Sequence, residues 1–212
     1  MVIFQQKITV FIADDHEMTR KGIRNFLDQA PDIQVVGEAE DGEGVKRLVA
    51  QLRPRILLLD LVMPDLSPIE LEKWIRTHYP ETITLVLTAH DRDAYLSGMM
   101  EAGVAGYLDK KLRAGQLISA IRRAARGEFL FDKKQIERAR HWRQDVSQKW
   151  ENLSLREREV LQMLTEGAEN KAISAALGIT VNTVEKHLEN IYKKLGVTSR
   201  TEAIHWWIER AT

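Results

Sequence analysis

The sequence predicts an α/β fold with a doubly wound, five-stranded parallel sheet, followed by a small all-α domain. Short apolar, β-branched runs alternate with amphipathic stretches up to about residue 127. The run from Ile56 to Leu59 is apolar enough for a strand that is buried on both faces. After Trp150 the β-branched runs disappear and helix signals dominate. Strands that alternate with helices form parallel sheets covered on both faces, which defines the fold class of the first part.

Each predicted strand is a short apolar run, and a stretch with helical spacing follows it. The strands are expected at residues 8–13, 33–36, 55–59, 83–87 and 105–108. The helices are expected near residues 19–29, 43–52, 68–78, 92–102 and 114–126. This regular alternation favours a parallel sheet with helices on both faces.

A polar, charged segment without proline separates the two parts of the chain. It covers residues 128–148 and has some helical periodicity, so we interpret it as a partly helical linker. The first domain then spans residues 1–127 and the second spans residues 149–212. Helices of the second domain are expected near residues 155–166, 170–177, 181–195 and 200–210.

Residues typical of helix ends support these four helices. The segments from Ser154 to Glu157 and from Ser199 to Glu202 match the capping box, in which both side chains bind free backbone N–H groups. Glycines fall where the C-terminal caps of helices are expected, at Gly167, Gly178 and Gly196.

Composition excludes several classes of protein. Hydrophobic residues make up 44% and charged residues 29%, which is typical of a globular chain rather than a disordered or collagen-like one. The absence of cysteine excludes disulfides, cysteine-ligated metals and thiol catalysis. The first residues lack a signal-peptide core, and no run approaches 18 apolar residues, so a cytoplasmic protein is expected. With 31 basic and 31 acidic residues, the chain has no overall attraction to nucleic acid.

Polar residues follow four of the predicted strands. Function in a doubly wound sheet collects beyond the C-terminal strand ends, where Asp14, Asp15, Asp60, Thr88 and Lys110 are expected. Carboxylates that meet at one edge repel one another unless a cation compensates, and magnesium is the common oxygen-liganded choice. One carboxylate can then attack phosphorus, while a lysine and a threonine bind the phosphoryl oxygens.

Each of these residues also has an ordinary explanation. A carboxylate after a strand is often the N-cap of the next helix, a single threonine often packs or caps, and neighbouring lysines are often plain surface. The joint occurrence at four strand ends makes coincidence improbable.

Residues 7–126 resemble the receiver domain of bacterial two-component response regulators, which has a flavodoxin-like fold. The matching motifs are ADDHEMTRKGI, LLLDLVMPDLSPIE, VLTAHD and GVAGYLDKKL. The resemblance implies that a sensor histidine kinase phosphorylates Asp60. It also implies that Asp15, Asp60 and the backbone carbonyl of Val62 ligate magnesium, while Asp14 contacts the ion mainly through water.

The same resemblance assigns the switch residues. Thr88 and Lys110 would bind the phosphoryl group, and Tyr107 would be the aromatic side chain that changes its packing when Thr88 moves toward the phosphate. Apart from the resemblance, His90 is two residues beyond Thr88 and is a candidate neighbour of the phosphate pocket, although a histidine without a partner at i+3 or i+4 is more often an ordinary surface or packing residue. One departure is Pro68, which stands where the family usually has the glycine of MPxxxG, so an unusual loop path after Asp60 is expected.

The second domain contains a segment with helix-turn-helix proportions. Residues 170–177 and 181–195 flank the turn at residues 178–180. In the longer helix one apolar stripe is expected to be buried, and the N-terminal part of the opposite face would enter the DNA major groove. Periodicity alone suits a protein-binding helical bundle equally well. The stripe consists of Val184, Leu188, Ile191 and Leu195.

The segment LREREVLQMLTEGAENKAISAALGITVNTVEKHLENIYKKLGV resembles the LuxR-type DNA-binding domain. Together with a receiver, it indicates a NarL/FixJ-class response regulator, which implies a transcription factor that binds double-stranded DNA half-sites as a homodimer. By this resemblance the candidate DNA contacts are Lys171, Thr180, Asn182, Thr183, Lys186, His187 and Lys193.

Charge argues against strong DNA binding by one copy of this domain. Residues 147–212 contain nine basic and nine acidic residues. Glu185 and Glu189 lie on the predicted recognition face, where they can accept a hydrogen bond from cytosine N4 but repel phosphates. We therefore predict weak non-specific binding and dependence on a dimer.

Two other functions are compatible with parts of the sequence. A phosphatase of the haloacid-dehalogenase type would carry DxDx(T/V) after its first strand, whereas Asp14 and Asp15 are adjacent here and the presumed acceptor follows the third strand. No enzyme activity is therefore expected. The second alternative is a response regulator whose helical output domain binds protein rather than DNA, and a salt-dependent DNA titration would distinguish it.

Overall fold

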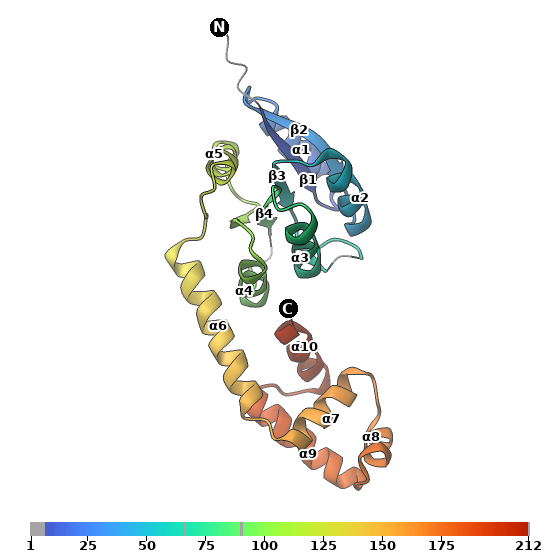
Figure 1. The fold of residues 1–212 in the computed structure, drawn as a ribbon. Helices are drawn as coiled ribbons and strands as arrows, with labels where there is room; N and C mark the ends of the chain where they lie inside the picture. Colours follow the sequence, from blue (N-terminus) through green and yellow to red (C-terminus); the bar gives the residue numbers. More distant parts are fainter. Residues whose placement is uncertain (1–6, 66, 90, 212) are drawn as a thin grey trace. The chain divides into compact units, whose positions relative to one another are not determined.

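The computed structural model describes residues 7–65, 67–89 and 91–211. His90 therefore lies outside the described residues. The chain divides into two compact units, with the boundary between Ala139 and Arg140. Figure 1 shows the strands in the first unit and only helices in the second. Within the described residues, no helix is both long enough and apolar enough to cross a lipid bilayer.

The first unit contains one sheet of five parallel strands, as predicted. Their order is β2-β1-β3-β4-β5, so the strand order reverses at β1. In such sheets ligands bind beyond the C-terminal strand ends at this reversal. The strands are β1 (Ile8–Ala13), β2 (Ile33–Ala39), β3 (Ile56–Leu59), β4 (Ile83–Thr88) and β5 (Gly106–Asp109).

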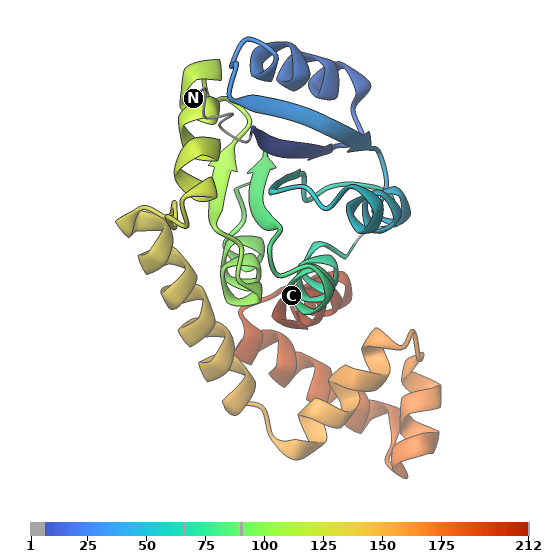
Figure 2. The same cartoon turned by 45° about the horizontal axis from the view of Figure 1, so that its top comes forward.

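Helices cover both faces of the sheet, as Figure 2 shows. The period-two alternation of strand side chains explains how one sheet fills two cores. Phe11 and Leu57 pack into the core formed with α2, α3 and α4, whereas Val10 and Ile56 pack into the core formed with α1 and α5. The helices are α1 (Glu17–Leu27), α2 (Gly42–Leu52), α3 (Pro68–His78), α4 (Asp93–Ala102) and α5 (Ala114–Ala125).

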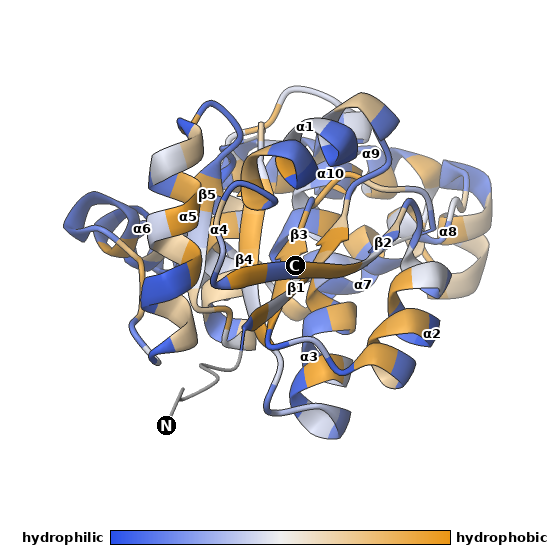
Figure 3. Ribbon diagram, turned by 90° about the horizontal axis from the view of Figure 1, so that it is seen from above, coloured by the Kyte–Doolittle hydropathy of each residue, from blue (hydrophilic) through white to orange (hydrophobic). Residues whose placement is uncertain are grey.

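Hydropathy follows this layered arrangement. Figure 3 shows mostly hydrophobic strands, and helices whose colour alternates between hydrophobic and hydrophilic. β2 extends to Ala39, three residues beyond its predicted end. The predicted strand was too short because Gly37 and Glu38 carry no apolar signal. Gly37 is needed there: a Cβ atom at this position would lie 2.6–2.9 Å from side-chain atoms of Leu52 and Phe11.

Pro68 begins α3 and does not interrupt it. At the first position of a helix the fixed φ of proline is favourable, and the missing N–H would have had no partner in the helix. Asp65, three residues earlier, has a φ of +53° in the left-handed region. The departure from the family motif is therefore accommodated by a turn at Asp65 and an immediate helix start.

The second unit is built from helices alone. The polar segment after the receiver contains one continuous helix, α6 (Lys133–Glu151), which passes the boundary between the units. The predicted stripe of Val184, Leu188, Ile191 and Leu195 is buried, in a core shared with the neighbouring helices. These helices are α7 (Leu155–Thr165), α8 (Asn170–Leu177), α9 (Val181–Leu195) and α10 (Arg200–Ala211).

The predicted helix ends of this unit are confirmed, with one difference. Ser154 and Glu157 form a full capping box. Ser199 accepts a hydrogen bond from the Glu202 N–H, but the Glu202 carboxylate binds the backbone N–H and hydroxyl of Thr198. The predicted capping box of Ser199 and Glu202 is therefore wrong in one of its two hydrogen bonds. The Glu202 carboxylate binds Thr198 instead of the Ser199 N–H, because Thr198 offers it two donors. The three capping glycines have φ between +64° and +83°.

Candidate functional site

Strand register brings the predicted acidic residues together. Ala13 of β1 pairs with Leu59 of β3, so Asp14 and Asp60 each follow directly after paired residues. The Asp60 N–H donates to the Ala13 carbonyl at 2.8 Å, which holds the two strand ends side by side. Asp14 and Asp60 are 2% and 4% exposed. Two carboxylates are thus nearly removed from solvent at the point where the strand order reverses.

Lys110 provides a cation between these two carboxylates. Its Nζ lies 2.7 Å from Asp14 Oδ2 and 2.6 Å from Asp60 Oδ2. Burial opposes the charge of Lys110, but the hydrogen bonds to Asp14 and Asp60 outweigh this effect and raise its pKa. The other Asp60 oxygen, Oδ1, accepts the Leu61 N–H at 2.8 Å. Both oxygens of Asp60 are therefore oriented by donors.

Asp15 and His16 complete the acidic cluster. One ligand atom from each of Asp14, Asp15, His16 and Asp60 lies within 4.8 Å of the others. His16 Nδ1 is 2.6 Å from Asp15 Oδ1, and its backbone N–H donates to Asp14 Oδ1. His16 was not predicted to belong to the site, because no second histidine lies three or four residues away. Its position directly after two strand-end aspartates was the available signal.

The donor set fits a hard divalent cation. Three carboxylates supply oxygen atoms, which magnesium prefers, and the partly exposed side of the cluster at Asp15 gives access to solvent. Val62 lies two residues beyond Asp60 in the same loop and is 47% exposed. The cluster therefore has the chemistry of a magnesium site.

Thr88 and Tyr107 lie on the neighbouring strands. Thr88 ends β4, is 2% exposed, and its carbonyl accepts the Lys110 N–H at 3.0 Å. Tyr107 in β5 is 4% exposed and pairs with Val86 of β4. Burial raises the pKa of the Tyr107 hydroxyl well above its usual value, and the Asp91 carboxylate adds to this effect. The backbone of Lys110 thus connects β5 to the end of β4.

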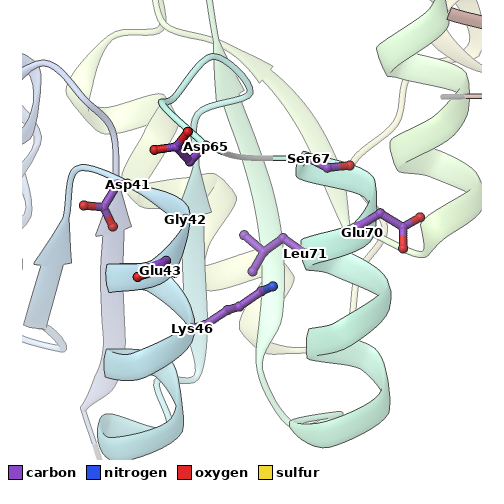
Figure 4. A pocket seen from close by; sticks show the side chains of 8 residues that line it. All are labelled: Asp41, Gly42, Glu43, Lys46, Asp65, Ser67, Glu70 and Leu71. Carbon is purple, nitrogen blue, oxygen red and sulfur yellow. The ribbon is translucent and has the colours of Figure 1, made fainter. Parts of the chain in front are cut away.

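A separate cavity of about 400 Å³ lies between the beginnings of α2 and α3. Figure 4 shows Lys46 and Leu71 pointing toward each other across it, whereas Glu70 points away. Asp41 lines this cavity but already accepts the Gly44 N–H as a helix cap. Because none of the acidic-cluster residues lines it, this cavity is distinct from the cluster.

The candidate DNA-contacting residues lie on α8, on α9 and in the turn between them. Thr180 caps α9 by accepting the Thr183 N–H, and its hydroxyl lies 2.8 Å from that of Thr183. Both hydroxyls are therefore partly engaged within the protein. The remaining candidates are exposed or half-exposed, namely Lys171, Asn182, Lys186, His187 and Lys193.

Acidic residues share this face of α9. Glu185 and Glu189 are exposed, as predicted, and neither carboxylate makes an ion pair with the part of the chain that the structure describes. Lys194, at the end of the same helix, is instead bonded to Glu157 of α7 at 2.7 Å. The face combines free carboxylates with lysines, and residues 147–212 as a whole have no net charge.

Comparison with known proteins identifies both units. The family model of the response regulator receiver domain matches residues 10–122. The model described as bacterial regulatory proteins of the luxR family matches residues 151–207. The second match favours DNA binding over a protein-binding output domain, and neither match is to a phosphatase family.

Full-length relatives show the same combination. The chain is 40% identical to the transcriptional regulatory protein LiaR of Bacillus subtilis over 200 residues, covering 92% of this chain and 94% of LiaR. It is 34% identical to the response regulator VraR of Staphylococcus aureus over 197 residues, covering 93% and 94%.

A solved structure is similar over the same length. It is RcsB of Salmonella enterica serovar Typhimurium bound to promoter DNA with the phosphomimetic BeF3⁻, with a TM-score of 0.61 at 29% identity and coverage of 95% of this chain and 98% of RcsB. The chain belongs to the two-component response regulators and joins a receiver domain to a luxR-family DNA-binding domain.

Proposed function

We propose that this protein is a cytoplasmic transcription regulator whose DNA binding is controlled by phosphorylation of Asp60 by a sensor histidine kinase. The observation that carries the proposal is the environment of Asp60. Its buried carboxylate is held by Lys110 on one oxygen and by the Leu61 N–H on the other, beside Asp14. A nucleophile oriented in this way needs little rearrangement before it attacks phosphorus.

In the proposed reaction an oxygen of Asp60 forms a new P–O bond while the P–N bond of the kinase phosphohistidine breaks and its electron pair returns to the imidazole. The Lys110 ammonium and the Thr88 hydroxyl stabilise the negative phosphoryl oxygens. Asp14, Asp15, Asp60 and the Val62 carbonyl would hold Mg²⁺, which neutralises phosphoryl charge when bound. No catalytic residue of a separate enzyme activity is assigned.

The switch is proposed to run from Asp60 through Thr88 and Tyr107. The phosphoryl group adds charge where Lys110 now bridges two carboxylates, so the hydrogen bonds of this pocket must change. Thr88 and Tyr107 lie on adjacent strands that end at this pocket. Their rearrangement would change the receiver surface that controls the helical domain or pairs with a second receiver.

DNA contact is proposed for α9 and its surroundings. Lys171, Lys186 and Lys193 would contact phosphates, while Asn182, Thr183 and His187 would approach base edges and Thr180 would hold the helix start. RcsB, bound to promoter DNA in its solved structure, is similar over 95% of this chain. Because the helical domain is neutral, two domains in a homodimer would be required for tight binding.

A DNA selection experiment tests the proposal. The full chain with Mg²⁺ and beryllofluoride is incubated with a random duplex library, and Asp60→Asn is the matched control. Enrichment of paired half-sites by the native protein, but not by the variant, is expected. Equal enrichment by both proteins would show that Asp60 does not control DNA binding, and no enrichment by either would contradict DNA binding.

A further inference from the structure

The segment after α5 returns to the receiver sheet. The Leu130 N–H donates to the Ala105 carbonyl at 2.6 Å, and Leu130 forms a bridge with Gly106 at the start of β5. Gly106 makes this approach possible, because a Cβ atom there would lie 2.9 Å from the Leu130 Cβ. Ala139 in α6 is 1% exposed and belongs to the receiver core. We call residues 128–139 the docked segment.

Two polar side chains of the docked segment bind the elements that lead to the phosphorylation site. Gln135 Nε2 donates to the Tyr107 carbonyl at 2.8 Å. Arg138 forms a two-pronged pair with Asp91, at 2.8 and 2.9 Å, and its Nε donates to Asp93 at 2.7 Å. Asp91 lies in the loop after Thr88, and Asp93 begins α4. One arginine therefore fixes the loop that follows Thr88.

The charges of this arrangement are matched. The Arg138 side chain is 25% exposed, and its pKa is raised by the hydrogen bonds to Asp91. A guanidinium group can bind both oxygens of one carboxylate while contacting a second carboxylate, which an ammonium cannot do with the same geometry. Loss of Arg138 would leave two neighbouring carboxylates, at Asp91 and Asp93, without this cation.

The two side chains that hold the docked segment, Gln135 and Arg138, bind the chain close to residues of the acidic site. Gln135 binds the backbone of Tyr107, three residues before Lys110, and Lys110 bridges Asp14 and Asp60. Arg138 binds Asp91, three residues after Thr88. A displacement of Lys110 or Thr88 would therefore move the nearby backbone at Tyr107 or Asp91, to which Gln135 and Arg138 are bound.

We propose that Arg138 is a positioning residue of the phosphorylation site, which couples docking of residues 128–139 to the state of Asp60. The docked segment favours the unphosphorylated arrangement, in which Lys110 is bound to the Asp60 carboxylate. Modification of Asp60 adds charge and volume beside Lys110, shifts the ends of β4 and β5, and loosens the docked segment. This inference rests on the proposed function and adds a regulator of that same site.

Reciprocity follows from thermodynamic linkage. If modification of Asp60 weakens docking, weakened docking must favour modification by the same factor. Because α6 continues to Glu151 in the second unit, a change at Arg138 acts on the first element that leads to the DNA-binding domain. Arg138 would then transmit the state of Asp60 along the chain.

Three variants separate this role from a general effect of charge on α6. Arg138→Gln removes the two-pronged ion pair with Asp91. Arg138→Lys keeps the positive charge but cannot bind both oxygens of Asp91 in the same way. Arg140→Gln is the matched control, because Arg140 is exposed two residues further along the same helix and its side chain makes no ion pair with the described residues. If Arg138 only contributed surface charge or general stability, Arg138→Gln would not bind beryllofluoride at Asp60 more tightly than Arg140→Gln does.

The first measurement is hydrogen exchange of the backbone amides of residues 130–139 in the full-length, unmodified proteins. Faster exchange is expected in Arg138→Gln than in native protein or Arg140→Gln, with Arg138→Lys between them. Adding Mg²⁺ and beryllofluoride to native protein should also accelerate this exchange. Unchanged exchange in Arg138→Gln would overturn the docking role of Arg138.

The second measurement is the apparent affinity for beryllofluoride with Mg²⁺ in the same four proteins. Tighter binding by about three- to tenfold is expected for Arg138→Gln, and no change for Arg140→Gln. Equal or weaker binding by Arg138→Gln, while native protein binds normally, would overturn the coupling alone. If native protein bound no beryllofluoride, the proposed function would fail, and the coupling would fail with it.

Discussion

Lys110 Nζ lies 2.6 Å from Asp60 Oδ2, so the proposed phosphoryl acceptor is already paired with a fixed cation. The same ammonium contacts Asp14 at 2.7 Å. Carboxylates at this edge are therefore neutralised in part by the protein itself. This arrangement makes the site sensitive to changes at Lys110 and to added cations.

Removal of the Lys110 charge should destabilise the receiver and increase its response to magnesium. In Lys110→Met the buried carboxylates of Asp14 and Asp60 lose their shared partner, at a cost of about 1–3 kcal/mol. Mg²⁺ should recover more stability in this variant than in native protein. Thermal unfolding across a magnesium titration measures both effects, and an equal magnesium response in the two proteins would contradict the role of Lys110.

Thr88 should matter for the response to phosphorylation more than for phosphorylation itself. Thr88→Val keeps the shape of the buried side chain but removes its hydroxyl. Asp60 should still be modified, whereas the gain in DNA affinity should fall to a small fraction of the native gain. Intact mass and DNA titration on the same samples separate these steps. Full retention of the DNA response would exclude a switch through Thr88.

The unpaired carboxylates of α9 should limit non-specific DNA binding. Glu185→Gln combined with Glu189→Gln removes two charges that repel phosphates, so affinity for random duplex DNA should increase several-fold. Lys193→Gln should weaken binding and reduce the slope of log affinity against log salt by about one. Fluorescence anisotropy over a salt series measures these changes. Unaltered binding in all three substitutions would place the DNA surface elsewhere.

The pair between Glu157 and Lys194 should contribute stability to the helical domain only above acidic pH. Burial alone would raise the pKa of Glu157, but the Lys194 ammonium and the Ser154 capping bonds lower it overall. A lowered folded-state pKa stabilises the fold above the unfolded value of about 4.3 and loses this contribution as pH falls through the folded value.

Lys194→Met should therefore cost about 1 kcal/mol at pH 7, since the lysine is partly exposed, and progressively less at acidic pH. Hydrogen exchange of α7 to α10 amides in the full chain reports the stability of this domain at each pH. A cost that stays constant from pH 7 to pH 3 would indicate lost packing rather than a lost ion pair.

Much of the receiver could be predicted because its strands are short apolar runs and its polar residues follow them. Asp14 and Asp60 meet because parallel strands end at one edge, and the pairing of Ala13 with Leu59 sets their separation. The end of β2 was less predictable, since Glu38 carries no apolar signal and Gly37 is required by its close packing against Leu52 and Phe11. Local apolar patterns carry no such information.

Side-chain partnerships over long sequence distances could not be predicted. The pair of Arg138 with Asp91 joins residues that are 47 positions apart. Arg138 lies in the segment that the sequence predicts to be a polar linker. The double contact of Lys110 also depends on tertiary geometry, although a lysine at that strand end was expected to bind phosphate. The residue types in the sequence indicate which side chains can form ion pairs, but only the tertiary structure determines which residues they pair with.

Phosphorylation of Asp60 is the central claim, and intact mass tests it most directly. Native protein and Asp60→Asn are incubated with acetyl phosphate and Mg²⁺, and the product is mapped by peptide. We predict the gain of one phosphoryl group in native protein, located at Asp60, and no gain in the variant. The same gain in Asp60→Asn, or no gain in native protein, would contradict the account.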